Sequence, residues 1–318
     1  MEGLRISAVV PTFNGRALVE RTLATLFAQA MPAGAFEVIA VVDGSTDGTG
    51  AALRALDAPC AFRVIEQENR GPAAARNAGW RVARGEIVLF VDGDMLCDAG
   101  LVAAHLAAHE EGDRLAAFGS LFLSEDSPCT LAAECFNHEI GAMHLAHRSS
   151  AEAEWRLTDC VFSNSSIGRE VLEEFGGFDE RFRMREDLEL GLRLLRAGVR
   201  AKYVPAAKAY QYYAKSAADL MRDAEAFGRA DALLAETHPE VLIAGHVRWL
   251  ERQKRWKLSV MRLAARAPGL WDVALKPVCA VGERFLGNSR LRGAGMRALQ
   301  IRRRLRWLRS ATRDSLKR

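Results

Sequence analysis

Residues 86–94 read EIVLFVDGD, an almost continuous apolar run that stops at two aspartates separated by one glycine. An apolar run without polar alternation is typical of a central strand in a parallel sheet, covered on both faces. Two neighbouring carboxylates repel each other unless a positive charge lies near them. The stretch therefore predicts a buried strand and, at its carboxyl end, a place where a cation is needed.

Strand-like and helix-like patterns alternate along the first half of the chain. Short runs rich in β-branched residues are typical of strands, and apolar residues at helical spacing follow each of them. The strand-like runs are RISAVVP (5–11), FEVIAVVD (36–43), FRVIEQ (62–67) and EIVLFVD (86–92). The helical stretches between them are 16–30, 50–56 and 71–84. This order predicts an α/β fold with a Rossmann-like, mostly parallel sheet.

The second half of the chain is less regular. We expect a helix at 98–111, a strand at 115–123 and a late strand at 199–205 that ends at Pro205. Residues 124–157 show no clear pattern.

Charge divides the chain into two parts. Residues 247–318 carry 20 Lys and Arg against 4 Asp and Glu, which leaves 24 basic and 36 acidic residues in the rest of the chain. From about residue 217 the pattern is also helical. We therefore expect a first domain at 1–220 and a basic helical extension at 221–318.

Composition restricts the class of protein. A chain of 318 residues with 49% hydrophobic content can bury at least one full core. We expect neither a signal peptide nor a transmembrane helix, because no apolar run approaches about 18 residues. The six cysteines are scattered, without a CxxC pair, which favours free thiols in a reducing compartment. We therefore expect a cytoplasmic globular protein.

Polar residues follow the strands where nucleotide-binding proteins hold phosphates. The P-loop pattern GxxxxGK[ST] and the dinucleotide pattern GxGxxG are both missing after the first strand. Thr12 and Asn14 follow the first strand, Asp43 the second, and Asp92 and Asp94 the fourth. In an open α/β sheet, ligands bind outside the carboxyl ends of the strands, so these side chains should meet in one crevice.

Five motifs in series resemble the family 2 glycosyltransferases of the GT-A fold. They are VVPTFN (9–14), VVDGSTDGT (41–49), NRGPAAARNAGW (69–80), DGD (92–94) and GGFDERFRMREDLELGLRL (176–194). They keep the family's order over roughly residues 4 to 215. The resemblance implies a nucleotide-sugar donor, a divalent metal ion and transfer with inversion.

The two aspartates of DGD are the expected metal ligands. Mg²⁺ or Mn²⁺ prefers carboxylate and phosphate oxygens, and needs few protein carboxylates when the substrate supplies phosphates. The resemblance makes Asp94 the direct ligand and places Asp92 nearer the donor ribose, or on the ion through water. The alternative is a simple strand-ending turn.

The resemblance assigns donor binding to the ends of the first two strands. It gives this role to Pro11, Thr12 and Asn14, and it makes Asp43 the acceptor of a hydrogen bond from the nucleotide base. Many family members have two acids before the GS pair, whereas this chain has Val42 and then Asp43. The nucleotide is therefore left open, and Asp43 could instead cap the GSTDGT turn.

Two further stretches are expected near the donor. The resemblance places Arg76 and Asn77 against the diphosphate or the strand-end loop, with a solvated helical arginine as the alternative. Ser163 and Asn164 occupy the stretch that faces the sugar in relatives.

Inverting transfer needs a general base that takes the proton of the acceptor hydroxyl. The resemblance makes Asp187 this base and Glu186 its neighbour or an acceptor contact, although the helix dipole favours acids at a helix start in any case. Many relatives carry a histidine where KAYQYY (208–213) has Gln211. Since glutamine is a poorer metal ligand, we expect weak metal binding without the donor.

The basic residues 247–318 indicate a surface-binding function. Ile301, Leu305 and Leu308 recur at helical spacing between arginines, as in an interfacial helix on an anionic membrane. An acidic protein partner, packing on the rest of the chain and nucleic acid are the alternatives, and nucleic acid is the least favoured.

Together these features predict a metal-dependent, inverting glycosyltransferase, peripheral at the inner face of the cell membrane. It would move a sugar from a nucleotide-diphosphate donor to a glycan or lipid-linked acceptor in cell-envelope glycan or glycolipid synthesis. The alternatives are a non-catalytic nucleotide-sugar-binding or scaffold protein with the same fold and, less favoured, a sugar nucleotidyltransferase.

Overall fold

The computed structural model describes residues 4–32, 34–112, 114–149, 155, 157–239 and 255–315. The chain forms two compact units: Met1–Asp126 with Ile140–Tyr212, and Ser127–Glu139 with Tyr213–Arg318. The expected boundary at residue 220 falls inside helix α8 (Ala217–Thr237), whereas the units divide before this helix, after Tyr212. Ser216 caps the helix, because its hydroxyl oxygen accepts a hydrogen bond from the Asp219 N–H. The predicted boundary rested partly on the change in charge along the chain, and such a change does not show at which residue a helix begins.

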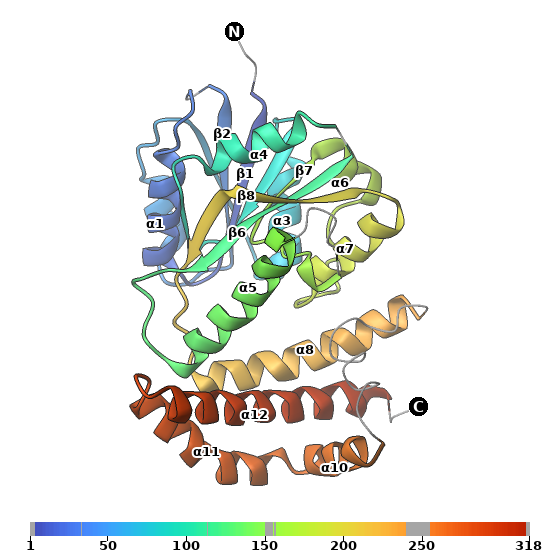
Figure 1. The fold of residues 1–318 in the computed structure, drawn as a ribbon. Helices are drawn as coiled ribbons and strands as arrows, with labels where there is room; N and C mark the ends of the chain where they lie inside the picture. The colour runs from blue at the N-terminus through green and yellow to red at the C-terminus, as the bar shows by residue number, and fades with distance from the viewer. Residues whose placement is uncertain are drawn as a thin grey trace. The chain divides into compact units, whose positions relative to one another are not determined.

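The first unit is built on one sheet of eight strands in the order β3-β2-β1-β4-β7-β6-β8-β5 (Figure 1). The strands are β1 (Ile6–Thr12), β2 (Phe36–Asp43), β3 (Ala61–Gln67), β4 (Ile87–Val91), β5 (Met95–Cys97), β6 (Leu115–Leu123), β7 (Asn164–Gly168) and β8 (Arg200–Gln211). Strands β1 to β4 and the pair β6 and β8 are parallel, whereas β7 and β5 run antiparallel to their neighbours. The expected mostly parallel sheet is confirmed.

Helices cover both faces of this sheet, so the central strands are apolar on both sides. The helices are α1 (Arg16–Phe27), α2 (Thr49–Arg54), α3 (Pro72–Arg81), α4 (Leu101–His109), α6 (Arg169–Phe175), α7 (Glu186–Arg196) and the short 3-10 helix η1 (Leu157–Asp159). Helices α1, α2 and α4 contribute to one core cluster, and α3, α6 and α7 to the other. All five residues of β4 are buried, as the continuous run predicts.

One expectation for the second half is wrong. Strand β8 does not end at Pro205 but continues to Gln211, and its register with β6 shifts between Gly119 and Ser120. The proline lies in this irregularity, where no ladder hydrogen bond is needed from its nitrogen. Residues without a clear pattern form α5 (Leu131–Ser149), a helix that begins in the second unit and ends in the first.

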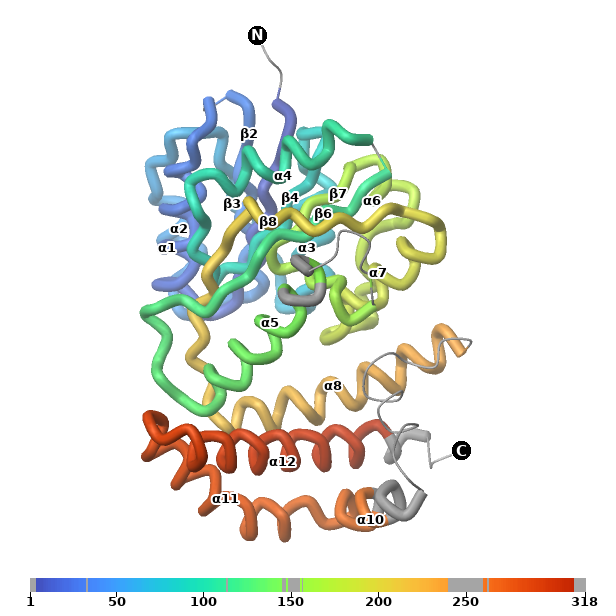
Figure 2. Tube along the Cα trace, in the orientation of Figure 1, coloured from blue at the N-terminus to red at the C-terminus, as the bar shows by residue number. Residues whose placement is uncertain are grey.

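The second unit consists of helices, with α12 (Ser289–Ser315) packed between α8 and α11 (Pro268–Arg284), as Figure 2 traces. Helix α10 (Arg255–Arg266) also packs on α12. The expected interfacial stripe on α12 is wrong for Leu305 and Leu308, which are buried with Trp307 in the core of this unit. None of the helices in the described part of the chain combines the length and apolar character needed to cross a membrane. Of the expected basic segment 247–318, residues 247–254 and 316–318 lie outside the described residues.

Candidate active site

The acidic turn Asp92-Gly93-Asp94 directly follows β4, at the carboxyl end of the sheet. The Met95 N–H donates to the Asp92 carbonyl over 3.2 Å and closes the turn. A Cβ atom at Gly93 would lie 3.0 Å from the carbonyl oxygen of Pro11, so only glycine fits beside the end of β1 without displacing its neighbour. The end of β1, at Pro11 and Thr12, therefore lies against the acidic turn.

Arg76 joins the acidic turn to the start of α7. Its two terminal guanidinium nitrogens each donate over 2.7 Å, one to Asp92 Oδ1 and the other to Glu186 Oε1. The guanidinium also lies over the ring of Phe178, with 5.5 Å from Cζ to the centroid. Burial lowers the pKa of Arg76, but the negative charges of Asp92 and Glu186 outweigh it and raise that pKa above its ordinary value. In this structure Arg76 pairs with two carboxylates, one of them in the turn after β4, and it is buried, so the alternative of a solvated helical arginine is wrong.

Glu186 and Asp187 begin helix α7, as expected, but their environments differ. Glu186 is buried and ion-paired with Arg76. Desolvation by the surrounding protein raises the pKa of Asp187 to about 7, and the negative charge of Glu186 adds to this, while Arg185 and Arg76 oppose it. A carboxylate with a pKa near neutrality can take up a proton during a reaction.

The backbone is unusual on both sides of this site. Among the described residues, the two non-glycine residues with positive φ are Asn14, at 46°, and Arg185, at 68°. Asn14 follows β1 and Arg185 immediately precedes Glu186. Left-handed conformations of such residues cost energy and concentrate at functional sites. No sequence pattern indicated the conformation of Arg185.

Asp94 lies against Gln211, the residue expected from the sequence to replace a histidine of many relatives. Gln211 Nε2 donates to Asp94 Oδ2 over 2.9 Å, and the Tyr212 N–H donates to the Asp94 carbonyl over 2.9 Å. This contact follows from the antiparallel pairing of β5 with β8, which sets Met95 opposite Gln211. Gln211 therefore positions the carboxylate of Asp94.

The donor set of this turn fits a hard divalent cation. Arg76 engages only Oδ1 of Asp92, whose Oδ2 accepts no hydrogen bond from a described residue, and Asp94 supplies further carboxylate oxygens. Mg²⁺ and Mn²⁺ prefer such oxygens. In the described ranges no three His, Cys, Asp or Glu side chains gather into a ready metal cage. Asp92 and Asp94 are therefore the residues that could hold such an ion together with oxygens from a substrate.

Asp43 is buried beneath the loop that leads into α3. Its carboxylate accepts hydrogen bonds from the backbone N–H groups of Arg70, over 2.9 Å, and Gly71, over 2.8 Å, and from Gln67 Nε2 over 2.7 Å. The alternative role as a cap of the GSTDGT turn is wrong, because Asp47 accepts from the Thr49 N–H and caps that turn. Asp43 fixes the loop, and its contact with a nucleotide base stays a prediction.

The loop after β2 is tied to the loop after β1 through Asn14. The Asn14 N–H donates to Ser45 Oγ over 3.0 Å, and the Thr46 N–H donates to Asn14 Oδ1 over 2.8 Å. The side chain of Asn14 thus organises the edge where the donor is expected.

Asn77 is fully buried and holds the loop before α7. Its amide donates to the Phe178 carbonyl and to Glu180 Oε1, and its Oδ1 accepts from Trp80 Nε1 and the Phe178 N–H. Any part of Asn77 in donor binding is therefore indirect. Glu180, unassigned in the sequence analysis although it lies in GGFDERF, anchors the same loop. The hydrogen bond from Asn77, followed by that from Arg81, lowers the pKa of Glu180.

Asn164 is buried and its side chain is held by hydrogen bonds within the protein, so its expected position facing the sugar stays a prediction. Its amide donates to the carbonyls of Ser120 and Ala207, and its Oδ1 lies 2.9 Å from His105 Nε2. Side chains alternate along a strand, so Asn164 points into the core towards α4. Burial lowers the pKa of His105 to about 4, which keeps this histidine neutral. The Asp92 N–H donates to the Ser163 carbonyl over 3.1 Å.

Comparison with known proteins identifies the family of this chain. A sequence model described as glycosyl transferase family 2 matches residues 7–176, more than half of the chain. The chain belongs to glycosyl transferase family 2. An uncharacterized glycosyltransferase of Bacillus subtilis is 39% identical to this chain over 118 residues, which cover 36% of this chain and 30% of the relative. The pre-mycofactocin glycosyltransferase of Mycobacterium tuberculosis is 26% identical over 258 residues, 74% of this chain and 48% of the relative.

Family 2 members are transferases, and this chain spans between 23% and 58% of the length of eight curated relatives that it matches. Among solved structures, a mannosyltransferase from Pyrobaculum calidifontis in complex with GDP-Man and Mn²⁺ superposes with a TM-score of 0.64 at 22% identity, covering 94% of this chain and 86% of that one. S. aureus TarS 1–349 in complex with UDP-GlcNAc gives 0.53 at 19% identity, covering 98% and 92%. The expected GT-A fold is confirmed.

Proposed function

We propose that this chain is a metal-dependent, inverting glycosyltransferase that uses a nucleotide-diphosphate sugar. One observation carries the proposal: Arg76 connects the carboxylate of Asp92 with Glu186, the neighbour of Asp187. The arrangement would bring together an acidic turn that can bind a cation and a carboxylate that can accept a proton. Activation of the donor needs the first, and deprotonation of the acceptor needs the second. Relatives solved with GDP-Man, UDP or UDP-GlcNAc support the donor class.

On the donor side, the loops after β1 and β2 would hold the nucleotide and the acidic turn its diphosphate. Asp94, with Asp92, would hold Mg²⁺ or Mn²⁺, which when bound stabilises the departing diphosphate. Gln211 keeps Asp94 in place, and Arg76 fixes one oxygen of Asp92. A relative solved with Mn²⁺ supports the choice of metal.

On the acceptor side, Asp187 would take the proton of the attacking hydroxyl. The raised pKa, about 7, makes it basic enough to accept the proton and ionised enough to act near neutral pH. Glu186, held by Arg76, would position the start of α7. The hydroxyl would attack the anomeric carbon from the face opposite the diphosphate, so the configuration inverts.

We further propose that the basic second unit holds the enzyme at a membrane surface, on the cytoplasmic face. Residues 255–315 carry 15 Lys and Arg against three Asp and Glu, and this excess supports attraction to anionic lipids. A lipid-linked or glycan acceptor in cell-envelope synthesis would suit such a location.

The activity can be tested with UDP-, GDP- and TDP-sugars, each incubated with Mg²⁺, Mn²⁺ or EDTA. We expect release of the nucleoside diphosphate from one donor class, dependent on the metal and lost in Asp94→Asn. Exposed Glu173→Gln serves as the control variant and should keep full activity. If a donor binds but no nucleoside diphosphate is released with any acceptor, the non-catalytic alternative is favoured. If no donor binds and none is turned over, the proposal is overturned.

A further inference from the structure

Helix α11 has an apolar face that no described element covers. The main neighbours of this helix among the described elements are α12 and α10. Leu270 and Val273 are 73% and 76% exposed, and Val281 is 44% exposed. Pro277, between them in sequence, is exposed as well. At about 100° per residue, positions spaced by three and four residues share one face, so these side chains form a continuous stripe along α11.

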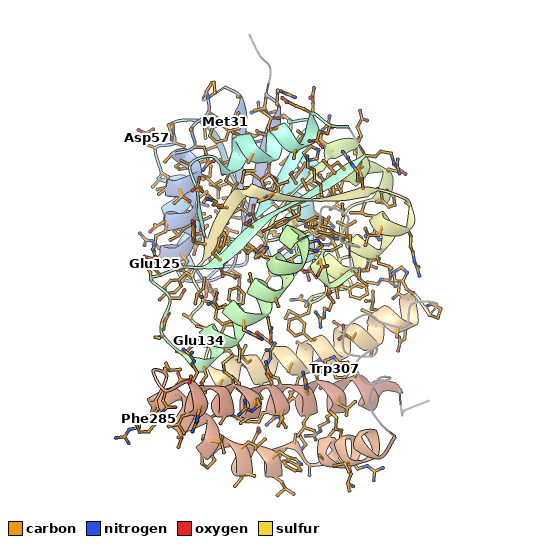
Figure 3. The ribbon with its side chains drawn as sticks, in the orientation of Figure 1. Met31, Asp57, Glu125, Glu134, Phe285 and Trp307 are labelled. Carbon is orange, nitrogen blue, oxygen red and sulfur yellow. The ribbon has the colours of Figure 1, made fainter. Side chains whose placement is uncertain are left out.

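The opposite face of α11 is the one that packs in the protein. Asp272 accepts from Arg302 Nε over 2.9 Å, and a Cβ atom at Gly282 would lie 2.7 Å from the Cα of Gly295 on α12. These contacts fix which side of α11 meets α12. The stripe therefore points away from α12, and Figure 3 shows side chains extending from that side of the helix.

The ends and edges of the stripe have the composition of an interfacial helix. Trp271 is partly exposed at the edge of the stripe, and Phe285, labelled in Figure 3 just past the end of α11, is 47% exposed. The guanidinium of Arg284 lies over the ring of Phe285. Tryptophan, phenylalanine and arginine beside an apolar face are typical of helices that lie in the plane of a membrane.

Positive charges without counter-ions accompany the stripe in the same helical unit. Several basic side chains are exposed and form no ion pair within the described part of the chain: Arg266, Lys276, Arg284, Arg290 and Arg297. Other arginines of α12 are neutralised inside the unit, as Arg302 and Arg306 are by Asp272. The uncompensated charges complement an anionic surface.

We propose that the apolar face of α11, formed by Leu270, Val273, Pro277 and Val281, inserts into the interface of an anionic lipid bilayer. The inference rests on the proposed membrane-surface function and names the element that makes the contact. A second copy of the chain is a poorer occupant, because it would bring two strongly basic units together. The face differs from the stripe expected on α12, whose Leu305 and Leu308 are buried in the protein.

Vesicle binding by the full chain tests this assignment. The double variant Val273→Glu with Val281→Glu should bind vesicles of phosphatidylcholine with phosphatidylglycerol at least about tenfold more weakly than the unchanged chain, because carboxylates cannot enter the apolar layer. The control is Val82→Glu, at a valine of the first unit whose exposure, 38%, is close to the 44% of Val281. It should bind as the unchanged chain does. Pure phosphatidylcholine vesicles should bind every form weakly.

The outcomes separate this inference from the proposed enzyme activity. Release of nucleoside diphosphate in solution, without vesicles, should be the same in the double variant and the unchanged chain, and both should melt at the same temperature. Equal vesicle binding by the double variant and the unchanged chain, or no binding by either, would overturn the inference. So would a dimer of the unchanged chain, seen by light scattering, that the double variant lacks, since the face would then belong to a second copy.

Discussion

The buried guanidinium of Arg76 donates over 2.7 Å to a carboxylate oxygen of Glu186, a residue 110 positions further along the chain. Through this contact α3 fixes the start of α7. The other terminal nitrogen of Arg76 holds Asp92, so one arginine sets the spacing between the acidic turn and the proposed base. The positive charge that lies beside the acidic turn in this structure is therefore supplied by the protein.

Replacement of Arg76 tests this connection. In Arg76→Met, Glu186 loses its buried counter-ion, and we expect a loss of about 3 kcal/mol in the free energy of unfolding. Arg76→Lys keeps the charge, but a lysine cannot bridge two carboxylates as a forked guanidinium does. Its loss in the free energy of unfolding should therefore be smaller than that of Arg76→Met but greater than zero. Urea unfolding measures both. Arg81→Met, which removes an exposed ion pair with Glu180, should cost less than about 1 kcal/mol. Equal losses in Arg76→Met and Arg81→Met would contradict the bridging role.

Asp187 should set the pH dependence of transfer. Since its pKa is raised to about 7, the carboxyl is protonated and inactive as a base below that pH and ionised above it. The value of kcat/KM should therefore rise with pH and reach half its plateau near pH 7, falling about tenfold per pH unit well below it. The same shift means that the folded chain binds a proton at Asp187 more tightly than the unfolded chain does. The resulting stabilisation is fully present below the ordinary pKa of an aspartate, decreases as the pH rises from there, and is lost by about pH 7.

The neighbouring charge supplies a sharper form of this test. Glu186→Gln removes a negative charge that raises the pKa of Asp187, so the half-plateau should move to lower pH by about one pH unit. The surface variant Glu173→Gln should leave the profile unchanged. An unchanged profile in Glu186→Gln would exclude Asp187 as the group that titrates.

Replacement of Asp94 should impair donor binding, whereas replacement of Asp187 should impair transfer. Asp94→Asn removes a carboxylate from the acidic turn, so metal-dependent donor binding should fall by about tenfold or more. Asp187→Asn should keep donor affinity and lose transfer by at least about a hundredfold, because the amide cannot accept the proton. Calorimetry of the nucleotide with Mn²⁺, alongside the transfer assay, measures both. Similar losses of binding in the two variants would contradict this division of roles.

Much of the site could be predicted from local sequence, but its connections could not. The run IVLFV and the turn after it depend on neighbouring residues only, and they lie as predicted. The role of Arg76 depends on a partner in α7, and the course of β8 past Pro205 depends on the register with β6. Amphipathic spacing also identified an apolar stripe on α12 without showing that two of its residues face inward. Long-range packing decided each of these points.

The contact between Gln211 and Asp94 predicts how the metal affinity can be changed. The group of Gln211 that meets Asp94 is an N–H donor, which holds the carboxylate but offers no lone pair to a cation. In Gln211→His a neutral imidazole nitrogen could join Asp94 in binding the metal, so the affinity for Mn²⁺ without nucleotide should rise by on the order of tenfold. The gain should disappear at about pH 5, where an imidazole is protonated. Electron paramagnetic resonance of free Mn²⁺ measures this, and the double variant Gln211→His with Asp94→Asn should show no gain. An affinity that does not change in Gln211→His would mean that residue 211 does not limit metal binding.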